Sequence, residues 1–132
     1  MRTSLTPARI NQAIEAITQA RIPNADGTVT DEFTGYIASF AAACIQSGLL
    51  PAVAFFENSD SQAQQDRSKL VDALKRMLPQ PPPQTLFAYL RDLGSTDLRE
   101  IEIDLREAIV ALKLALRTFP KPVSQPQTSP QA

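Results

Sequence analysis

The sequence of 132 residues contains no histidine and no tryptophan, and its only cysteine is Cys44. Without histidine the chain has no histidine-ligated metal site, no Ser-His-Asp triad and no imidazole general base. A single cysteine excludes an internal disulfide and a cysteine-based zinc site, and it favours a reducing compartment such as the cytoplasm. We therefore expect no catalytic residue, no bound metal and no cofactor.

The sequence also lacks a long apolar run and an excess of one charge. No stretch approaches the roughly 18 apolar residues of a membrane span, and we expect neither a signal peptide nor a membrane partner. Thirteen lysine and arginine residues against fourteen aspartate and glutamate residues give a net charge of −1. Proteins that bind nucleic acid by themselves usually have a basic excess. This balance argues against independent nucleic-acid binding but leaves room for a local basic patch.

Glycine is scarce, with 4 residues, whereas none of the 11 prolines falls in the interior of a predicted helix, and Pro7 and Pro51 lie where a first helical turn would start. Strand signals are nearly absent, because no sustained alternation of apolar and polar residues occurs. Helical periodicity predicts helices over 7–21, 31–47, a short segment from Pro51, 62–78, 84–93 and 97–119. The sequence therefore predicts an all-α fold, a compact bundle of about six helices with a long C-terminal helix. We expect residues 1–119 to form this domain and the proline-rich tail, 120–132, to be disordered because it has little to bury.

The last predicted helix has its side chains sorted by chemistry. On a helical wheel its core face covers about 80° and comprises Leu98, Ile101, Leu105, Ile109, Leu112, Leu116 and Phe119. One flank carries the basic line, which is about 27 Å long and comprises Arg99, Arg106, Lys113 and Arg117. The other side carries the acidic residues Asp97, Glu100, Asp104 and Glu107. The basic line has two interpretations: a solvated face with ion pairs such as Glu102–Arg106, or a surface for a phosphate backbone.

A second, thinner apolar stripe on the same helix comprises Ile103, Val110 and Leu114. A helix with one core face does not require it, so these residues are either scattered surface apolar groups or a contact with a neighbouring subunit. The predicted helix over 62–78 carries a smaller basic group that comprises Lys69, Lys75 and Arg76. These three either keep the helix soluble or contribute to the same phosphate contact.

Other polar and reactive groups give weaker signals. The acidic residues of the last helix could hold Mg²⁺ in principle, because carboxylates at i, i+3 and i+4 converge. Exposed acidic stripes are common, and we assign no metal site to them. Cys44 lies in an apolar run and is interpreted as a small buried hydrophobe. Arg9 and Arg21 are isolated charges near the ends of the first helix.

One segment resembles the signature of a known family. Gln46, Gly48 and Leu49 end one helix, and Ala52, Ala54 and Phe55 lie on the next. In physical terms Gly48 provides a left-handed helix end, the alanines allow close helix approach, and Phe55 is expected to fill the core. This pattern is similar to that of the small helical subunit of the type III-B CRISPR effector, the Cmr complex. The resemblance covers about residues 8 to 119 and includes Phe87-Ala88-Tyr89-Leu90.

The resemblance implies a non-catalytic subunit for antiviral defence. Copies would stack beside the guide RNA paired with its target RNA, and the protein would contact backbone and shape rather than sequence. The implied partners are other subunits of the complex, copies of the chain itself and the RNA backbone, with no small-molecule substrate. The alternative is a small helical adaptor or scaffold in an unrelated assembly that contains no nucleic acid.

Overall fold

The computed structural model describes residues 6–57 and 67–122, and in these ranges it contains six α-helices and no strand. Their bounds are α1 Pro7–Gln19, α2 Asp31–Ser47, α3 Leu49–Glu57, α4 Ser68–Arg76, α5 Leu86–Arg91 and α6 Ser95–Leu116. The predicted all-α class and the long C-terminal helix, of 22 residues, are confirmed. Disorder was predicted for 120–132; of these residues Pro120 accepts a hydrogen bond from Val29 N–H at 2.9 Å and Lys121 pairs with Asp31 at 3.2 Å, and the tail beyond residue 122 lies outside the described residues.

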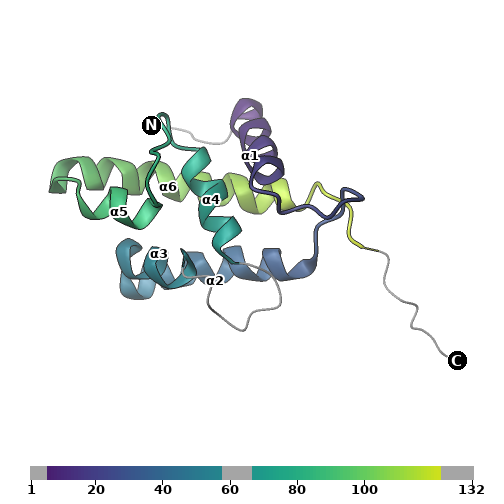
Figure 1. Ribbon diagram of the computed structural model, residues 1–132, viewed down its shortest axis with the longest axis horizontal. Coiled ribbons are helices and arrows are strands. Elements are labelled where there is room, and N and C mark those ends of the chain that lie inside the picture. The colour runs from purple at the N-terminus through teal and green to yellow at the C-terminus, as the bar shows by residue number, and fades with distance from the viewer. Residues whose placement is uncertain (1–5, 58–66, 123–132) are drawn as a thin grey trace, which may run out of the picture.

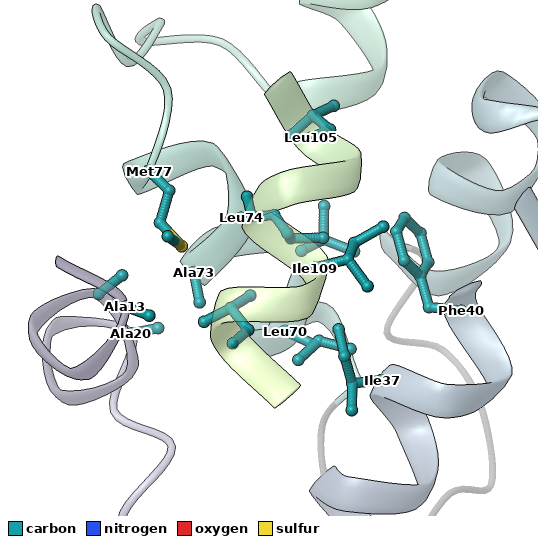
Figure 2. Packing of buried hydrophobic residues seen from close by; sticks show 14 of the residues in the cluster. Ala13, Ala20, Ile37, Phe40, Leu70, Ala73, Leu74, Met77, Leu105 and Ile109 are labelled. Carbon is teal, nitrogen blue, oxygen red and sulfur yellow. The ribbon is translucent and has the colours of Figure 1, made fainter. Parts of the chain in front are cut away.

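Helices α4 and α6 form the middle of the bundle. Helix α1 packs against both of them, and α2 packs against both from the opposite side (Figures 1 and 2). Helix α3 packs against α2, α4 and α5. As a result α6 contacts α1 along one side, α2 along the other and α4 between them, and within the described residues its outer surface faces solvent.

The core is built from the faces that the helical periodicity predicted. Leu105, Ile109, Leu112 and Leu116 of α6 are buried, and Figure 2 shows Ile109 directed toward Phe40 of α2. The other three residues of the predicted α6 core face are partly buried and pack against this cluster: Leu98, Ile101 and Phe119. Burial of such aliphatic side chains contributes about 1.5–3 kcal/mol each, which makes this the main source of stability.

The predicted role of Phe55 is wrong. Its side chain is 61% exposed, whereas the next residue, Phe56, is 4% exposed and packs edge-to-face on Phe40 with 5.3 Å between ring centroids. The reason is helical phase, because the buried residues of α3 are Leu49, Ala52, Val53 and Phe56, at i, i+3, i+4 and i+7. Residue 55 therefore turns away from the core.

The corner between α2 and α3 consists of one residue, Gly48. Its φ is +97°, and its N–H donates to the carbonyl of Cys44 at 3.0 Å. An L side chain is strained at this φ, so glycine is required here. Pro51 lies in the first turn of α3, where its missing N–H removes no helical hydrogen bond. The helix end predicted at Gly48 is confirmed with a positive φ, but its ψ of 164° lies outside the left-handed helical region, and α3 begins at Leu49 rather than at Pro51.

Helix α5 has only six residues and is held by a side chain from another helix. Both carboxylate oxygens of Glu57, the last residue of α3, accept backbone hydrogen bonds, from Leu86 N–H at 2.8 Å and Phe87 N–H at 3.1 Å. The N-cap Thr85 accepts from Ala88 N–H at 3.2 Å. The three N–H groups at the start of this short helix are thus satisfied, which fixes α5 against α3.

Candidate nucleic-acid interface

The basic line lies on the solvent side of α6. Arg99, Arg106 and Arg117 are exposed and Lys113 is half-buried. Within residues 6–57 and 67–122, none of the four forms an ion pair or a side-chain hydrogen bond, and the Glu102–Arg106 pair expected for a self-neutralised face is not formed. The four cations consequently form a strip without intramolecular ion pairs among the described residues on one flank of the helix, with the carboxylate of Glu102 one turn from Arg106.

On the other flank of α6, the carboxylate of Asp104 pairs with a side chain of α1. It accepts a hydrogen bond from Arg9 of α1 with 3.1 Å between Nη2 and Oδ1, and the same guanidinium group donates to the Asp104 carbonyl at 3.2 Å. The side chains of Arg9 and Asp104 are 16% and 27% exposed. Sequence analysis treated Arg9 as an isolated charge, because the partner lies far away in the chain. In the described part of the chain, no three acidic or cysteine side chains gather closely enough to hold a metal ion.

The basic residues of α4 have partners inside the chain. Lys69 Nζ donates to the carbonyl of Arg21 at 2.9 Å, and Lys75 Nζ donates to the carbonyl of Gln84 at 2.9 Å. Arg76 pairs with Asp72 one turn earlier at 2.9 Å. Each side chain therefore has a structural role, since it ties α4 to a loop or stabilises the helix itself. A phosphate contact by these residues would have to replace those bonds, which makes them weaker candidates than the basic line.

The second apolar stripe of α6 faces outward. Ile103 is 54% exposed, Val110 44% and Leu114 38%. The structure therefore places all three where a neighbouring subunit could cover them. Exposure allows a contact with a neighbouring subunit but does not demonstrate it, so this contact stays a prediction.

A groove of about 440 Å³ runs between α2 and α6 next to this stripe. Its apolar lining is Ala41, Cys44, Ile45, Leu49, Leu105, Ile109 and Val110, and its charged lining is Glu102 and Arg106. The side chain of Ile45 is 85% exposed. The sequence analysis missed Ile45, although a signal exists: no charged residue occurs between Glu32 and Glu57.

Cys44 lines this groove and is half-buried rather than buried as predicted. Loss of solvation and, to a smaller extent, the carboxylate of Glu102 together raise the pKa of its thiol to about 11, although Arg106 acts in the opposite direction. At neutral pH the thiol is protonated and is a poor nucleophile. The groove therefore offers a mainly apolar surface whose thiol is protonated at neutral pH.

None of the helices in the described segments is both long enough and apolar enough to cross a membrane. The features that could serve an assembly are instead at the surface of α6: the basic line, the outer apolar stripe and the groove beside α2.

The comparisons with known proteins agree with this picture. No curated protein and no solved structure matches the chain. A family model described as CRISPR-associated protein (Cas_Cmr5) matches residues 6–117. This range contains all six helices, the corner at Gly48 and the whole basic line. Because the match covers most of the 132 residues, the chain belongs to the Cas_Cmr5 family of CRISPR-associated proteins.

Proposed function

We propose that this chain is a non-catalytic small subunit of a type III-B CRISPR RNA-guided effector complex that acts in antiviral defence in the cytoplasm. Family membership identifies a CRISPR-associated Cmr subunit. In the proposed role, copies stack beside the guide RNA/target RNA duplex and support binding of the target RNA. The observation that carries the RNA role is the unpaired basic line of α6.

The line suits a phosphate backbone because of its length and its lack of internal partners. Arg99, Arg106 and Lys113 recur every seven residues, so about 10.5 Å separates successive charges along the helix axis. Exposed guanidinium and ammonium groups without an intramolecular partner can neutralise phosphates and release counterions, which gives salt-dependent affinity. The net charge of −1 provides no general attraction, so the contact would act mainly inside an assembly that already holds RNA.

The subunit contact would use the outward-facing stripe. Ile103, Val110 and Leu114 are exposed on the same helix that carries the basic line. Covering them would remove apolar surface from water and would set neighbouring copies along the RNA. Chemistry on the RNA would belong to other subunits, since this chain offers no histidine and only a protonated thiol.

The test is a charge reversal in the reconstituted complex. We change Arg99, Lys113 and Arg117 together to glutamate, and leave Arg106 unchanged because it also lines the groove. Exposed charges contribute little to stability, so the melting temperature should stay nearly the same. Capture of target RNA should weaken. The slope of log affinity against log salt should become shallower by the amount that corresponds to the loss of up to about three phosphate contacts.

The control is Arg91→Glu on α5, an exposed arginine outside the basic line that pairs with Asp92 at 3.6 Å. It should leave affinity and salt slope unchanged. Normal assembly of the triple variant with unchanged affinity and salt slope would contradict the RNA role. A stable complex with other proteins that never contains RNA would favour the adaptor alternative, for which the groove beside α2 is the supporting observation.

A further inference from the structure

The exposed side of α3 is apolar. Pro51, Ala54 and Phe55 are exposed there at i, i+3 and i+4, on one side of the helix, and these three residues form the α3 ridge. A solvent-facing helix normally carries polar or charged residues on its outer face, whereas the ridge has none and the side chain of Phe55 is 61% exposed. Aromatic residues are enriched in protein interfaces. The composition of the ridge is therefore typical of a surface that another protein covers.

One cation accompanies the ridge. The guanidinium group of Arg67 lies over the ring of Phe55, with 4.5 Å from its Cζ to the ring centroid, and over the ring of Phe56 at 5.1 Å. Within the described segments Arg67 forms no ion pair, and its Nε is buried without a hydrogen-bond partner. Stacking on the rings holds the group in place but does not neutralise its charge. The α3 ridge thus presents an exposed ring together with an unpaired positive charge.

The groove between α2 and α6 has the complementary chemistry. Its lining is mainly apolar, and it includes Glu102, which forms no ion pair with any other described residue. A cavity of about 150 Å³ is enough for a benzene ring, so the groove, with about 440 Å³, admits a phenylalanine ring and part of its surroundings. Leu49 is the residue of α3 that lines the groove, and Phe55 lies six positions later, which is about 240° further around the helix. Ridge and groove are therefore two different surfaces of one chain.

We propose that Phe55 of one copy inserts into the groove between α2 and α6 of the next copy, where Arg67 of the first pairs with Glu102 of the second. Because the two surfaces differ, the contact is head-to-tail, and a pair of copies retains one free ridge and one free groove for further copies. The inference rests on the stacking of copies in the proposed function and names the residues that make it. Val110 belongs both to the groove lining and to the outer apolar stripe, so the docked copy covers the stripe at this residue.

The contact leaves the basic line available to the RNA. Glu102 is half-buried in the groove, whereas Arg106 is exposed. When Arg67 of the neighbouring copy neutralises Glu102, the positive potential at Arg106, one helical turn away, becomes stronger. A second copy is favoured over an unrelated partner by this complementarity, since the chain itself supplies the ring and the cation for a groove that offers an apolar hollow and a carboxylate.

The experiment measures self-association of the free full-length chain, without RNA or other subunits, by sedimentation velocity at rising concentration. The wild type should form dimers, trimers and longer species, with no limit at the dimer. Phe55→Ala and Glu102→Arg should each weaken association by about tenfold or more, because the first removes the inserted ring and the second opposes two cations. The double variant Arg67→Glu/Glu102→Arg should associate at least about threefold more tightly than either single reversal, since the reversed pair attracts again.

A mixture of two defective variants tests the head-to-tail geometry. Phe55→Ala retains an intact groove and Glu102→Arg retains an intact ridge, so one complete contact can form between them. The mixture should give a 1:1 complex with about the dissociation constant of the wild-type contact and no longer species. At the same concentration each variant alone should remain mostly monomeric.

The matched control is Glu100→Arg, which reverses an exposed carboxylate of the same helix outside the groove lining and should associate like the wild type. Circular dichroism and thermal melting verify that each variant is folded. A wild type that stays monomeric at every concentration overturns the proposal, and so does one whose association stops at a dimer. Wild-type association of Phe55→Ala or Glu102→Arg, or a mixture without a 1:1 complex, overturns it as well. Since these measurements contain no RNA, their failure is distinct from a failure of the RNA role.

Discussion

Arg9 of α1 and Asp104 of α6 are separated by 95 residues in the sequence and form an ion pair of 3.1 Å. The pair is mostly shielded, and Arg9 Nε and Asp104 Oδ2 have no further hydrogen-bond partner in the described structure. The pair lies between α1 and α6, the two helices that pack most extensively against each other in the described structure. The pair therefore fixes the register of α1 on α6 and removes one carboxylate from the acidic side of α6.

We predict that Asp104→Ala lowers the free energy of unfolding by about 1–3 kcal/mol, because it leaves a shielded guanidinium group without its anionic partner, although the carbonyl of residue 104 and Gln12 still accept from it. Arg9→Met should cost less than Asp104→Ala if the methionine packs where the arginine stem lies. The double variant should be less destabilised than the sum of the two single ones. Urea denaturation measures all three.

The control is Glu100→Ala, which removes an exposed carboxylate from the same side of α6 and should change stability by less than about 0.5 kcal/mol. If the destabilisations caused by Asp104→Ala and Arg9→Met simply add in the double variant, the ion pair contributes no coupling energy.

The sequence predicted α2 with its observed bounds because its end signals are local. Thr30 precedes the helix as its N-cap residue, although its hydroxyl makes no capping hydrogen bond, and Gly48 ends the helix with a positive φ. The partnership of Arg9 with Asp104 and the capping of α5 by Glu57 could not be predicted in the same way. They depend on how helices that are far apart in the sequence meet in space.

The wrong assignment of Phe55 instead of Phe56 to the core has a different cause. Both residues are aromatic and adjacent, so composition does not distinguish them, and a shift of one residue rotates a side chain by about 100° around the helix. Sequence analysis started the helix at Pro51 and did not resolve the phase of its buried face, whereas the structure starts it at Leu49. The exposure of the outer stripe and of the basic line was predicted better, because both lie on one long helix whose phase was clear, whereas their contacts stay predictions.

The cap of α5 gives a second prediction. Glu57→Ala should lower the free energy of unfolding by about 1–2 kcal/mol, since the N–H groups of Leu86 and Phe87 lose their acceptor. Glu57→Gln retains one acceptor oxygen, so its free energy of unfolding should lie between those of the wild type and of Glu57→Ala. Hydrogen exchange at these two amides is the direct measurement, and it should accelerate in both variants. An alanine variant with unchanged exchange at Leu86 and Phe87 would show that the carboxylate does not cap the helix in solution.

Two glycines of the same helix region should respond oppositely to substitution. Gly48→Val should destabilise the protein by at least about 1 kcal/mol, because a β-branched residue is strained at a φ of +97°. Gly35→Ala should stabilise it by about 0.5–1 kcal/mol, since residue 35 is inside α2 and an added Cβ meets nothing within 4 Å. Thermal melting compares the two. Equal effects of the two substitutions would contradict the strained corner between α2 and α3.

The last prediction concerns Cys44 and its titration. Because burial raises the pKa of the thiol to about 11 from 9.0, the fraction of thiolate near pH 8 should be about 100-fold smaller than in the unfolded chain. Alkylation by iodoacetamide, followed by mass spectrometry at high dilution, should therefore be slow at pH 8 and should accelerate up to about pH 11.

Two variants of the groove give matched controls of opposite sign. Glu102→Gln removes a carboxylate that raises the pKa, so its alkylation at pH 8 should be faster than that of the wild type. Arg106→Gln removes a cation that lowers the pKa, so its alkylation should be slower.

The raised pKa of Cys44 also makes the stability of the protein depend on pH. The unfolded chain loses the thiol proton first, so the stabilisation that the protonated thiol provides below about pH 9 is lost as the pH rises toward 11. Cys44→Ala lacks this loss. A wild type and a Cys44→Ala variant whose stabilities fall in parallel between pH 9 and 11, together with rapid alkylation at pH 8, would show that the thiol is not desolvated in the groove.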